Sequence, residues 1–445
     1  MKTSPCRPIT GVAGLSEDAT GMQSPHTMSR QDVRTLSLAS LGGALEFYDF
    51  IIFVYFATVI GQLFFPPELP DWMKQLQTFG VFAAGYLARP LGGIIMAHFG
   101  DRMGRKRMFT FSILMMAVST LGMGLLPTYA DIGLAAPVLL LLLRVFQGAA
   151  IGGEVPGAWV FVAEHVPAHR IGLACGTVTC GLTLGILLGS LAATGVNTLF
   201  TPEQVLDDVW RGPFLLGGVF GLVSVYLRRW LAETPVFRAM QERKQLSEEL
   251  PLRVVARDHG RGVAISMALT GLLSAGIIVL ILMMPSILQK FYGFGAAESL
   301  RANSVATLFL SAGCITAGLI VDRIGAARFF LWFSPLLGLS ALIMFTLLRA
   351  DPSWLFPASA MVGLCVGVIG AVPHAMVHVF PGSVRFSGLS TSYNLAYAVF
   401  GGLTPIAVTM MLQASPLAPA LYVLLFGVVG SVTGLALKRG PHHAV

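Results

Sequence analysis

Charged residues are scarce in this chain of 445 residues, and that scarcity decides its class. Only 11% of the residues are Asp, Glu, Lys or Arg, whereas soluble proteins carry roughly 25%. Hydrophobic residues make up 55%, and the mean hydropathy is +0.75. Because the deficit of charge runs along the whole chain, we expect an all-α membrane protein that crosses the bilayer many times.

Several chemical signatures are also missing. Five cysteines, four of them in apolar segments, provide neither a disulfide framework nor the spacing of a metal site, so no metal is expected. No Walker loop, G-x-S-x-G or zinc motif occurs, which argues against an enzyme and against a cofactor. Residues 1–34 lack the apolar stretch of a signal peptide and predict a disordered cytoplasmic tail. Met28 is the expected natural start, which would make residues 1–27 dispensable.

Long apolar segments are what the chain has instead. A membrane-spanning helix needs ~20 apolar residues. The sequence predicts twelve spans, at residues 36–63, 76–99, 108–126, 135–163, 171–196, 212–231, 262–289, 301–321, 328–348, 354–379, 387–412 and 417–437. The one long polar stretch, 232–261, is expected to be a cytoplasmic linker between an N-terminal lobe (35–231) and a C-terminal lobe (262–438), with a short tail at 439–445.

Lysine and arginine gather in loops of alternate parity, which is the pattern of the positive-inside rule. This places both termini in the cytoplasm. The net charge of +7 therefore reflects contact with the lipid bilayer, and we expect no nucleic-acid partner.

A repeated motif relates the two lobes. The segment "HFGDRMGRKRMF" (98–109) aligns without gaps on "LIVDRIGAARFF" (319–330), and each copy follows the second span of its lobe. Either the basic residues only anchor the topology, or the acid and bases form a charge latch that breaks and re-forms during gating. The repetition favours the latch. The predicted gating residues are Asp101, Arg102, Gly104, Arg105, Lys106, Asp322 and Arg323.

These motifs resemble those of a known family. "GDRMGRKR" resembles the signature loop of the major facilitator superfamily, although Ala97 stands where Gly is usual, and "RVFQGAAIGGE" (144–154) is similar to its Arg-x-x-Gln-Gly pattern. With "ALEFYDF", "GGEVPGAWVFVAEHVPAHRIG" and "LRRWLAETPVF", the chain resembles the metabolite–proton symporters, among them permeases for proline/betaine, α-ketoglutarate, citrate and shikimate. The resemblance covers roughly 35–438. It implies two pseudo-repeats of six helices working by alternating access, and we expect a functional monomer.

Two acids stand one helical turn apart in the apolar run "ALEFYDFIIF" (44–53). A charge at the bilayer centre costs ~3 to ~15 kcal/mol, so Glu46 and Asp49 need a reason to be there. Their spacing puts them on one face, predicted to turn toward a central cavity and Arg144. Glu154 joins them as a candidate for proton coupling. Buried ion pairs of this kind are either architectural or functional; the resemblance implies functional roles for Glu46, Asp49 and Arg144.

Further polar residues inside the spans are candidates for substrate binding. Arg89, beside Pro90, either holds an anion or pairs with one of the span-one acids. Gln147 lies one turn after Arg144, on the same face. In span eleven, Tyr393, Asn394 and Tyr397 either line a cavity or bond between helices.

Tyr48 is a further candidate for substrate binding, and two histidines have several interpretations. Tyr48 either lines the pocket or packs against another face of its helix. His374 and His378, four residues apart, suit a metal, a proton relay or plain packing.

The sequence thus predicts a secondary transporter that imports a small anionic or zwitterionic metabolite with protons. In this hypothesis, protonation of Asp49 or Glu46 weakens a pairing with Arg144 or Arg89, and the freed arginine holds a substrate carboxylate. The alternative is a proton-driven exporter or a facilitator of a small metabolite or siderophore, with the same fold.

Overall fold

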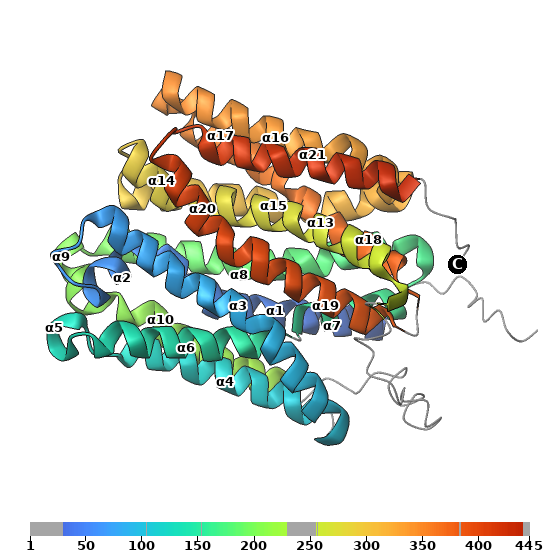
Figure 1. The fold of residues 1–445 in the computed structure, drawn as a ribbon, viewed down its shortest axis with the longest axis horizontal. Coiled ribbons are helices and arrows are strands. Elements are labelled where there is room, and N and C mark those ends of the chain that lie inside the picture. Colours follow the sequence, from blue (N-terminus) through green and yellow to red (C-terminus); the bar gives the residue numbers. More distant parts are fainter. Residues whose placement is uncertain are drawn as a thin grey trace, which may run out of the picture.

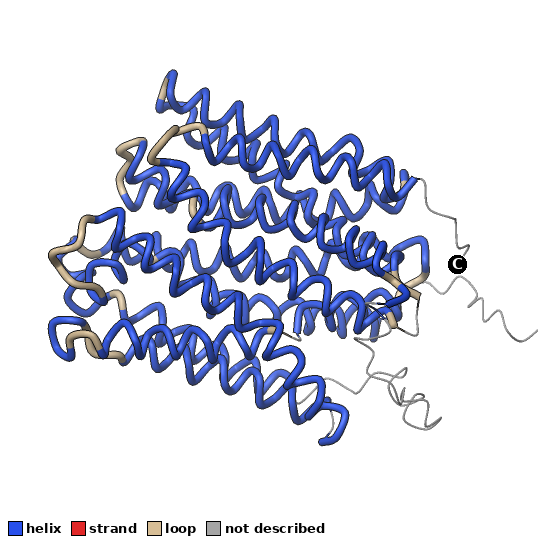
Figure 2. The backbone as a smooth tube through the Cα atoms, viewed as in Figure 1, coloured by secondary structure: helices blue, strands red, loops and turns tan. Residues whose placement is uncertain are grey.

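The computed structural model describes residues 30–103, 105–152, 154–228, 255, 257–381 and 384–438. They form a bundle of long helices that run side by side, with the loops gathered at the two ends (Figures 1 and 2). Of the predicted tails, residues 1–29 and 439–445 lie outside the described residues, as does most of the predicted linker, whereas residues 30–34 are helical and begin α1 rather than belonging to a disordered tail. Gly104 also lies outside the described residues.

The described part of the first half contains eight main helical segments and four short ones. The main segments are α1 (Arg30–Tyr55), α2 (Ala57–Phe64), α3 (Asp71–Met103), α4 (Arg105–Leu125), α6 (Ala135–Ile151), α7 (Glu154–His165), α8 (Ile171–Leu199) and α10 (Arg211–Arg228). The short ones are α5 (Tyr129–Ile132), η1 (Ala168–Arg170), α9 (Pro202–Gln204) and η2 (Val205–Val209).

The second half is built in the same way. Its α-helices are α13 (Gly260–Ile277), α14 (Met284–Phe291), α15 (Ala296–Ile324), α16 (Ala326–Ala350), α17 (Leu355–Val366), α18 (Val372–Val379), α19 (Arg385–Ala396), α20 (Gly402–Leu412) and α21 (Ala418–Lys438). Tighter or wider turns join several of them: η3 (Ile278–Leu282), η4 (Pro352–Trp354), η5 (Gly367–Ala371) and η6 (Tyr397–Gly401).

Eight helical stretches of the described chain are long and apolar enough to cross a membrane, and ten if two bent pairs each count as one span. Each of the twelve predicted segments overlaps helix in the structure, but their continuity differs. The first is bent by 59° between Tyr55 and Ala57. The fourth is divided into α6 and α7 at Gly152.

Proline explains where three helices of the second half change their winding. A proline ring clashes with the carbonyl of the residue four positions earlier and offers that carbonyl no N–H. In each of the three helices, the residue four positions before the proline lies in a turn that is not α-helical. For Pro285 this turn is η3, for Pro373 it is η5, and for Pro405 it is η6. The π-helical turn η6 is the one that carries Tyr397.

Glycine lets α3 and α6 touch backbone to backbone. A Cβ built on Gly148 would lie 1.8 Å from the carbonyl oxygen of Gly85, and one on Gly92 would lie 2.0 Å from that of Ala149. Small residues allow this close approach between helices in a membrane. The contact fixes the relative position of Arg89 on α3 and Arg144 on α6.

The two halves meet mainly where α8 packs along α15, and where α3 packs against α19, η6 and α20. A Cβ on Gly318 would lie 2.4 Å from the carbonyl oxygen of Gly172, so these backbones also touch. Hydroxyl pairs continue the α8–α15 contact at Thr183–Ser311 and Ser190–Ser304, each at 2.8 Å.

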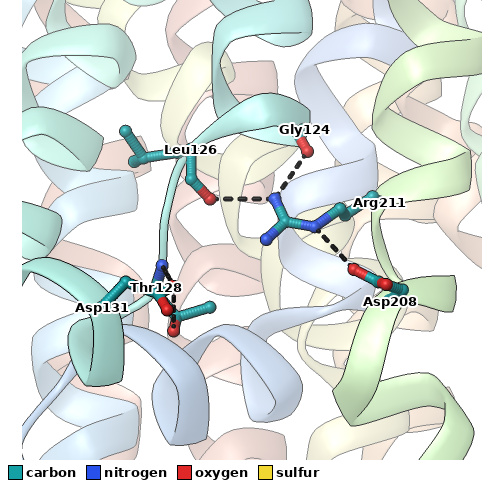
Figure 3. A network of polar contacts seen from close by, with 6 residues as sticks. All are labelled: Gly124, Leu126, Thr128, Asp131, Asp208 and Arg211. Carbon is teal, nitrogen blue, oxygen red and sulfur yellow. Dashed lines mark hydrogen bonds and ion pairs between the residues drawn. The ribbon is translucent and has the colours of Figure 1, made fainter.

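A polar cluster lies at the end of the bundle that holds α5 and α9 (Figure 3). Arg211 Nη1 donates to the carbonyls of Gly124 and Leu126, each at 2.9 Å, and so satisfies carbonyls left without partners at the end of α4. Its Nε lies 3.2 Å from Asp208 Oδ1. Nearby, the backbone N–H and the hydroxyl of Thr128 donate to Asp131 and hold the pKa of that carboxyl below its usual range.

Candidate functional site

Arg144 is buried in an aromatic shell. It is 0% exposed, and its Cζ lies 4.5 Å from the ring centroid of Phe50, 4.4 Å from Phe53 and 5.1 Å from Phe82. Its Nη1 donates to the carbonyl of Phe50 at 3.2 Å and to Gln147 Oε1. Stacked aromatic faces stabilise a buried cation without supplying a counter-charge.

Arg89 lies in a second group of rings, and this group spans both halves of the chain. Its Cζ is 5.6 Å from the centroid of Phe50 on α1 and 5.1 Å from Tyr86 on α3. From the second half, Tyr393 on α19 lies at 5.9 Å and Tyr397 on η6 at 5.0 Å. We call these four rings the aromatic box. Both arginines therefore face the ring of Phe50.

Neither arginine forms an ion pair with an acidic residue that the structure describes. Arg89 Nε, Arg144 Nε and Arg144 Nη2 are buried and have no hydrogen-bond partner in that part of the chain. Leaving a buried donor unsatisfied costs ~1 to ~3 kcal/mol, and more for a charged group. The arrangement is therefore prepared for an acceptor with several oxygens, such as a carboxylate.

Gln147 connects Arg144 to the helix that carries the two acids. Its side-chain oxygen accepts from Arg144, while its Nε2 donates to the backbone carbonyl of Asp49 at 3.1 Å and to Thr120 Oγ1 at 2.8 Å. The predicted shared face of Arg144 and Gln147 is present, and it joins α6 to α1 and α4.

Asp49 and Glu46 do share a face, but the predicted direction of that face was wrong. A Cβ on Gly217 would lie 2.7 Å from Asp49 Oδ1, and Ser224 donates to Glu46 Oε1 at 3.1 Å, so both acids face α10. Asp49 is 0% exposed, and neither of its oxygens has a hydrogen-bond partner among the residues described. The expected direct pairing of Asp49 with Arg144 is absent because Phe50, the next residue, is the one that meets Arg144.

Two other candidates also lie inside the first half. The Tyr48 hydroxyl donates to the carbonyl of Pro213 at 3.0 Å, and its ring meets Phe220 edge-on, so it packs on α10 rather than lining the aromatic box. Glu154, in the first turn of α7, accepts from Ser112 Oγ of α4 at 2.6 Å. Helical spacing alone did not reveal which neighbours these residues have.

The predicted residues of span eleven lie against the first half. The rings of Tyr393 and Tyr397 pack against each other with their centroids 4.8 Å apart. The ring of Tyr397 also stacks on that of Tyr86, with a centroid distance of 5.4 Å. Asn394 Nδ2 donates to the carbonyl of Gly152, where α6 ends. Tyr393, Asn394 and Tyr397 were predicted either to line a cavity or to bond between helices, and the structure shows contact between helices. Tyr393 and Tyr397 also lie around Arg89.

Asp322 joins the two halves at the end of the bundle that holds α18. Its Oδ1 accepts from the N–H of Gly172 at 2.7 Å and its Oδ2 from that of Leu173 at 2.8 Å, in the first turn of α8. Helix N-termini favour negative charge in this way. Arg323 is exposed beside it. The side chains of Asp101, Arg102, Arg105 and Lys106, like Gly104, lie outside the described residues.

The two histidines lie next to Asp322. Their rings are 4.3 Å apart, and His374 Nε2 lies 3.9 Å from Asp322 Oδ1. No group of three metal-binding side chains is found in the described part of the chain. At the same end, Glu164 lies 3.8 Å from Arg385 of α19, a second charged contact between the halves.

Sequence reasoning missed half of the six rings around the two arginines. Phe53, Phe82 and Tyr86 were not singled out, although one signal was available. Phe79, Phe82, Tyr86 and Arg89 follow each other at spacings of three and four residues, which puts them on one face of α3. Such a stripe usually indicates core packing, and only the arginine at its end distinguishes it.

Comparison with known proteins places this architecture in a family. The family model described as Major Facilitator Superfamily matches residues 51–405. A putative proline/betaine transporter of Staphylococcus aureus (strain COL) is 32% identical over 89% of this chain and 86% of its own length. The glycine betaine/proline/ectoine/pipecolic acid transporter OusA of Dickeya dadantii (strain 3937) is 30% identical over 91% of this chain and 83% of its own.

Solved structures show the same fold. The proton:xylose symporter XylE bound to 6-bromo-6-deoxy-D-glucose superposes with a TM-score of 0.74 at 17% identity, covering 92% of this chain and 95% of the symporter chain. An inward-open structure of the xylose transporter XylE from E. coli gives a TM-score of 0.66 at 16% identity, with coverages of 92% and 96%.

The family model and the relatives, which are named as transporters, identify a membrane transporter. The chain belongs to the major facilitator superfamily, and it is a multi-pass protein of the bacterial inner membrane.

Proposed function

We propose that this chain imports a small anionic or zwitterionic metabolite together with protons. In this proposal, residues 35–231 and 262–438 are two lobes of six spans each, joined by a linker at 232–261. The distribution of Lys and Arg supports twelve spans with both termini in the cytoplasm. Alternating access then arises from rocking of the lobes about a site between them.

The observation that carries the proposal is the pair of buried arginines, Arg89 and Arg144, which have no acidic partner among the described residues. A substrate carboxylate that reached Arg89 and Arg144 would accept from N–H groups that have no partner in the described structure. Charge-assisted hydrogen bonds of this kind are roughly twice as strong as neutral ones. Arg89 and Arg144 are therefore the proposed substrate-binding pair, with Gln147 positioning Arg144.

Asp49 is the proposed proton carrier. An ionised carboxylate buried without donors costs several kcal/mol, so the closed packing of Asp49 against α10 favours the neutral acid. Release of the proton would require water or a donor to reach the carboxylate, which links proton movement to a change in helix packing. Gln147 connects this segment of α1 to Arg144 and is the proposed coupling element.

The named relatives suggest which substrates to test first. Proteins similar over most of their length are described as transporters of proline, betaine, ectoine and pipecolic acid. These compounds are small and zwitterionic. Glycine betaine and proline are therefore the first candidates, with simple organic anions for comparison.

The test is uptake into proteoliposomes after a pH step, outside acidic. One pH unit corresponds to 1.36 kcal/mol per proton, so one coupled proton supports about tenfold accumulation per unit. We expect Asp49→Asn to abolish this accumulation but to retain exchange of labelled for unlabelled substrate. Arg144→Gln should weaken substrate binding about 10-fold to about 150-fold, from the loss of one charged hydrogen bond.

Asp207→Asn is the matched control, because Asp207 is an exposed aspartate in η2 and should leave uptake unchanged. Undiminished accumulation by both Asp49→Asn and Arg144→Gln would refute the proposed roles. If the wild-type protein accumulates substrate only with the opposite pH gradient, it is an exporter.

A further inference from the structure

We propose that the aromatic box of Phe50, Tyr86, Tyr393 and Tyr397 is the receptor for the positively charged nitrogen of a zwitterionic substrate, and that Arg89 occupies it as a built-in substitute until the substrate arrives. The inference rests on the proposed function and narrows it to substrates that carry a compact ammonium group as well as a carboxylate.

The box already holds a cation. The guanidinium carbon of Arg89 lies between 5.0 and 5.9 Å from all four ring centroids, within the ~6 Å range of cation–π attraction. Tyr86 and Tyr397 are parallel within 19°, while Phe50 and Tyr86 meet at 81°. Rings that surround a charge on several sides are the arrangement that recognises quaternary ammonium groups.

The box is also shared between the halves. Phe50 and Tyr86 come from α1 and α3, whereas Tyr393 and Tyr397 come from α19 and the π-helical turn η6. A cation held by all four rings therefore connects the two halves. Turns of this type are frequent at functional sites, and Pro405 accounts for its position in the chain.

The same place offers a carboxylate site. Arg89 is 2% exposed and Arg144 is 0% exposed, and both have buried N–H atoms without partners in the described chain. Both guanidinium groups lie over Phe50, at 5.6 and 4.5 Å. A substrate whose ammonium and carboxylate are one or two carbons apart would fit rings and arginines together.

Binding would then be an exchange of cations. The ammonium group takes the place of the Arg89 guanidinium among the rings, and Arg89 turns to the substrate carboxylate. Arg89 is long enough for such a movement, and it forms no ion pair with a described acidic residue that must first break. No net charge enters the box, because one cation replaces another. A substrate without a positive charge cannot make this exchange.

The test compares two ligands of the same shape on the full-length protein in detergent. Glycine betaine and 3,3-dimethylbutanoate differ only in the replacement of the quaternary nitrogen by carbon. A cation–π contribution of about 0.5 to about 2 kcal/mol predicts that betaine binds about 2-fold to about 30-fold more tightly. An ordinary apolar pocket would prefer the carbon compound, so equal or reversed affinities overturn the inference.

Two variants locate the preference in the box. Tyr397→Leu removes a ring and should bring the two affinities together, whereas Tyr397→Phe keeps the ring and should restore the preference for betaine. Tyr226→Leu is the control, since Tyr226 is 57% exposed on α10. Tyr397→Leu that keeps the full preference would overturn the assignment.

The substitute role of Arg89 has its own test. Tetramethylammonium has no carboxylate to attract Arg89, so it should bind the wild-type protein poorly. In Arg89→Gln it should bind at least about fivefold more tightly, because the competing cation is gone. No gain in a folded Arg89→Gln protein would overturn the exchange. If Arg89→Gln does not fold, the comparison of betaine with 3,3-dimethylbutanoate still decides the inference.

These outcomes are distinct from failure of the proposed function. Proton-driven accumulation of solutes without preference for betaine over 3,3-dimethylbutanoate would leave the symporter proposal standing and remove the aromatic-box assignment. Absence of pH-driven accumulation, together with a clear preference for betaine in binding, would do the reverse.

Discussion

Asp322 provides a quantitative test of how the halves are held closed. Its two oxygens accept from the N–H groups of Gly172 and Leu173, and its side chain is only 10% exposed. In Asp322→Asn one side-chain oxygen remains to accept from one N–H, but the amide –NH2 faces the other donor. The variant therefore loses one charged hydrogen bond, together with the attraction of a negative charge for a helix N-terminus.

The magnitude follows from these two losses. A hydrogen bond to a charged group contributes about 1.5 to about 3 kcal/mol, and the charge at a helix end adds about 0.5 to about 1 kcal/mol. A closed state weakened by about 2 to about 4 kcal/mol increases the ratio of open to closed molecules about 30-fold to about 700-fold. The fraction of open molecules rises by this whole factor as long as the open state remains the minor one.

Native cysteines report the opening. Cys175 and Cys314 are 0% exposed, on α8 and α15 respectively, and a Cβ on Gly176 would lie 2.5 Å from the carbonyl oxygen of Cys314. A charged, water-soluble maleimide reaches this contact only when the helices separate. The labelling rate of each cysteine, resolved by peptide mass spectrometry, should rise in Asp322→Asn by the predicted factor. Cys365, which is half-buried, serves as the internal reference.

Arg328, exposed in the first turn of α16, supplies the control, and Arg328→Ala should leave both rates unchanged. The reasoning is refuted if Asp322→Asn remains folded, by its melting temperature, and labels Cys175 and Cys314 at the wild-type rate. In that case the contact of α8 with α15 holds the halves together without the carboxylate.

Two further predictions concern stability. Arg211→Met should lower the free energy of unfolding by about 1.5 to about 3 kcal/mol, because the carbonyls at the end of α4 lose a charged donor. The shift of the thermal melting midpoint measures this loss. An unchanged midpoint would contradict the prediction and show that water replaces the guanidinium. Gly148→Ala should prevent the normal contact of α3 with α6, because its Cβ would lie 1.8 Å from Gly85 O, and betaine binding should fall as the arginines separate. The matched control is Gly195→Ala, whose Cβ would meet nothing within 4 Å, and equal binding by the two variants would contradict the prediction.

The amino-acid sequence alone predicts much of the architecture. Apolar segments of ~20 residues can only be helices in a bilayer, because each backbone group must find its partner within the segment. The repeated Asp-Arg motif marked Asp322, and the structure places it between the halves. Acids and arginines inside apolar runs identified Asp49, Arg89 and Arg144 as unusual, since a charge there is too costly to be incidental.

The sequence does not predict which residues of other helices lie next to these charged residues. Helical periodicity places Glu46 and Asp49 on one face, and it does not say which helix that face meets. The structure turns them to α10, where glycine at position 217 leaves room for a carboxylate. A rotation of one residue, about 100° around the helix axis, brings Phe50 rather than Asp49 to Arg144.

The aromatic box shows the same division. The sequence by itself determines that α3 carries a stripe of rings ending in Arg89, and that Tyr393 and Tyr397 lie one turn apart in a later span. Only tertiary structure brings these two stripes, some 300 residues apart, around one guanidinium. The physical reason is that local pattern specifies a face, whereas contact between helices depends on where small residues such as Gly92 and Gly148 allow backbones to touch.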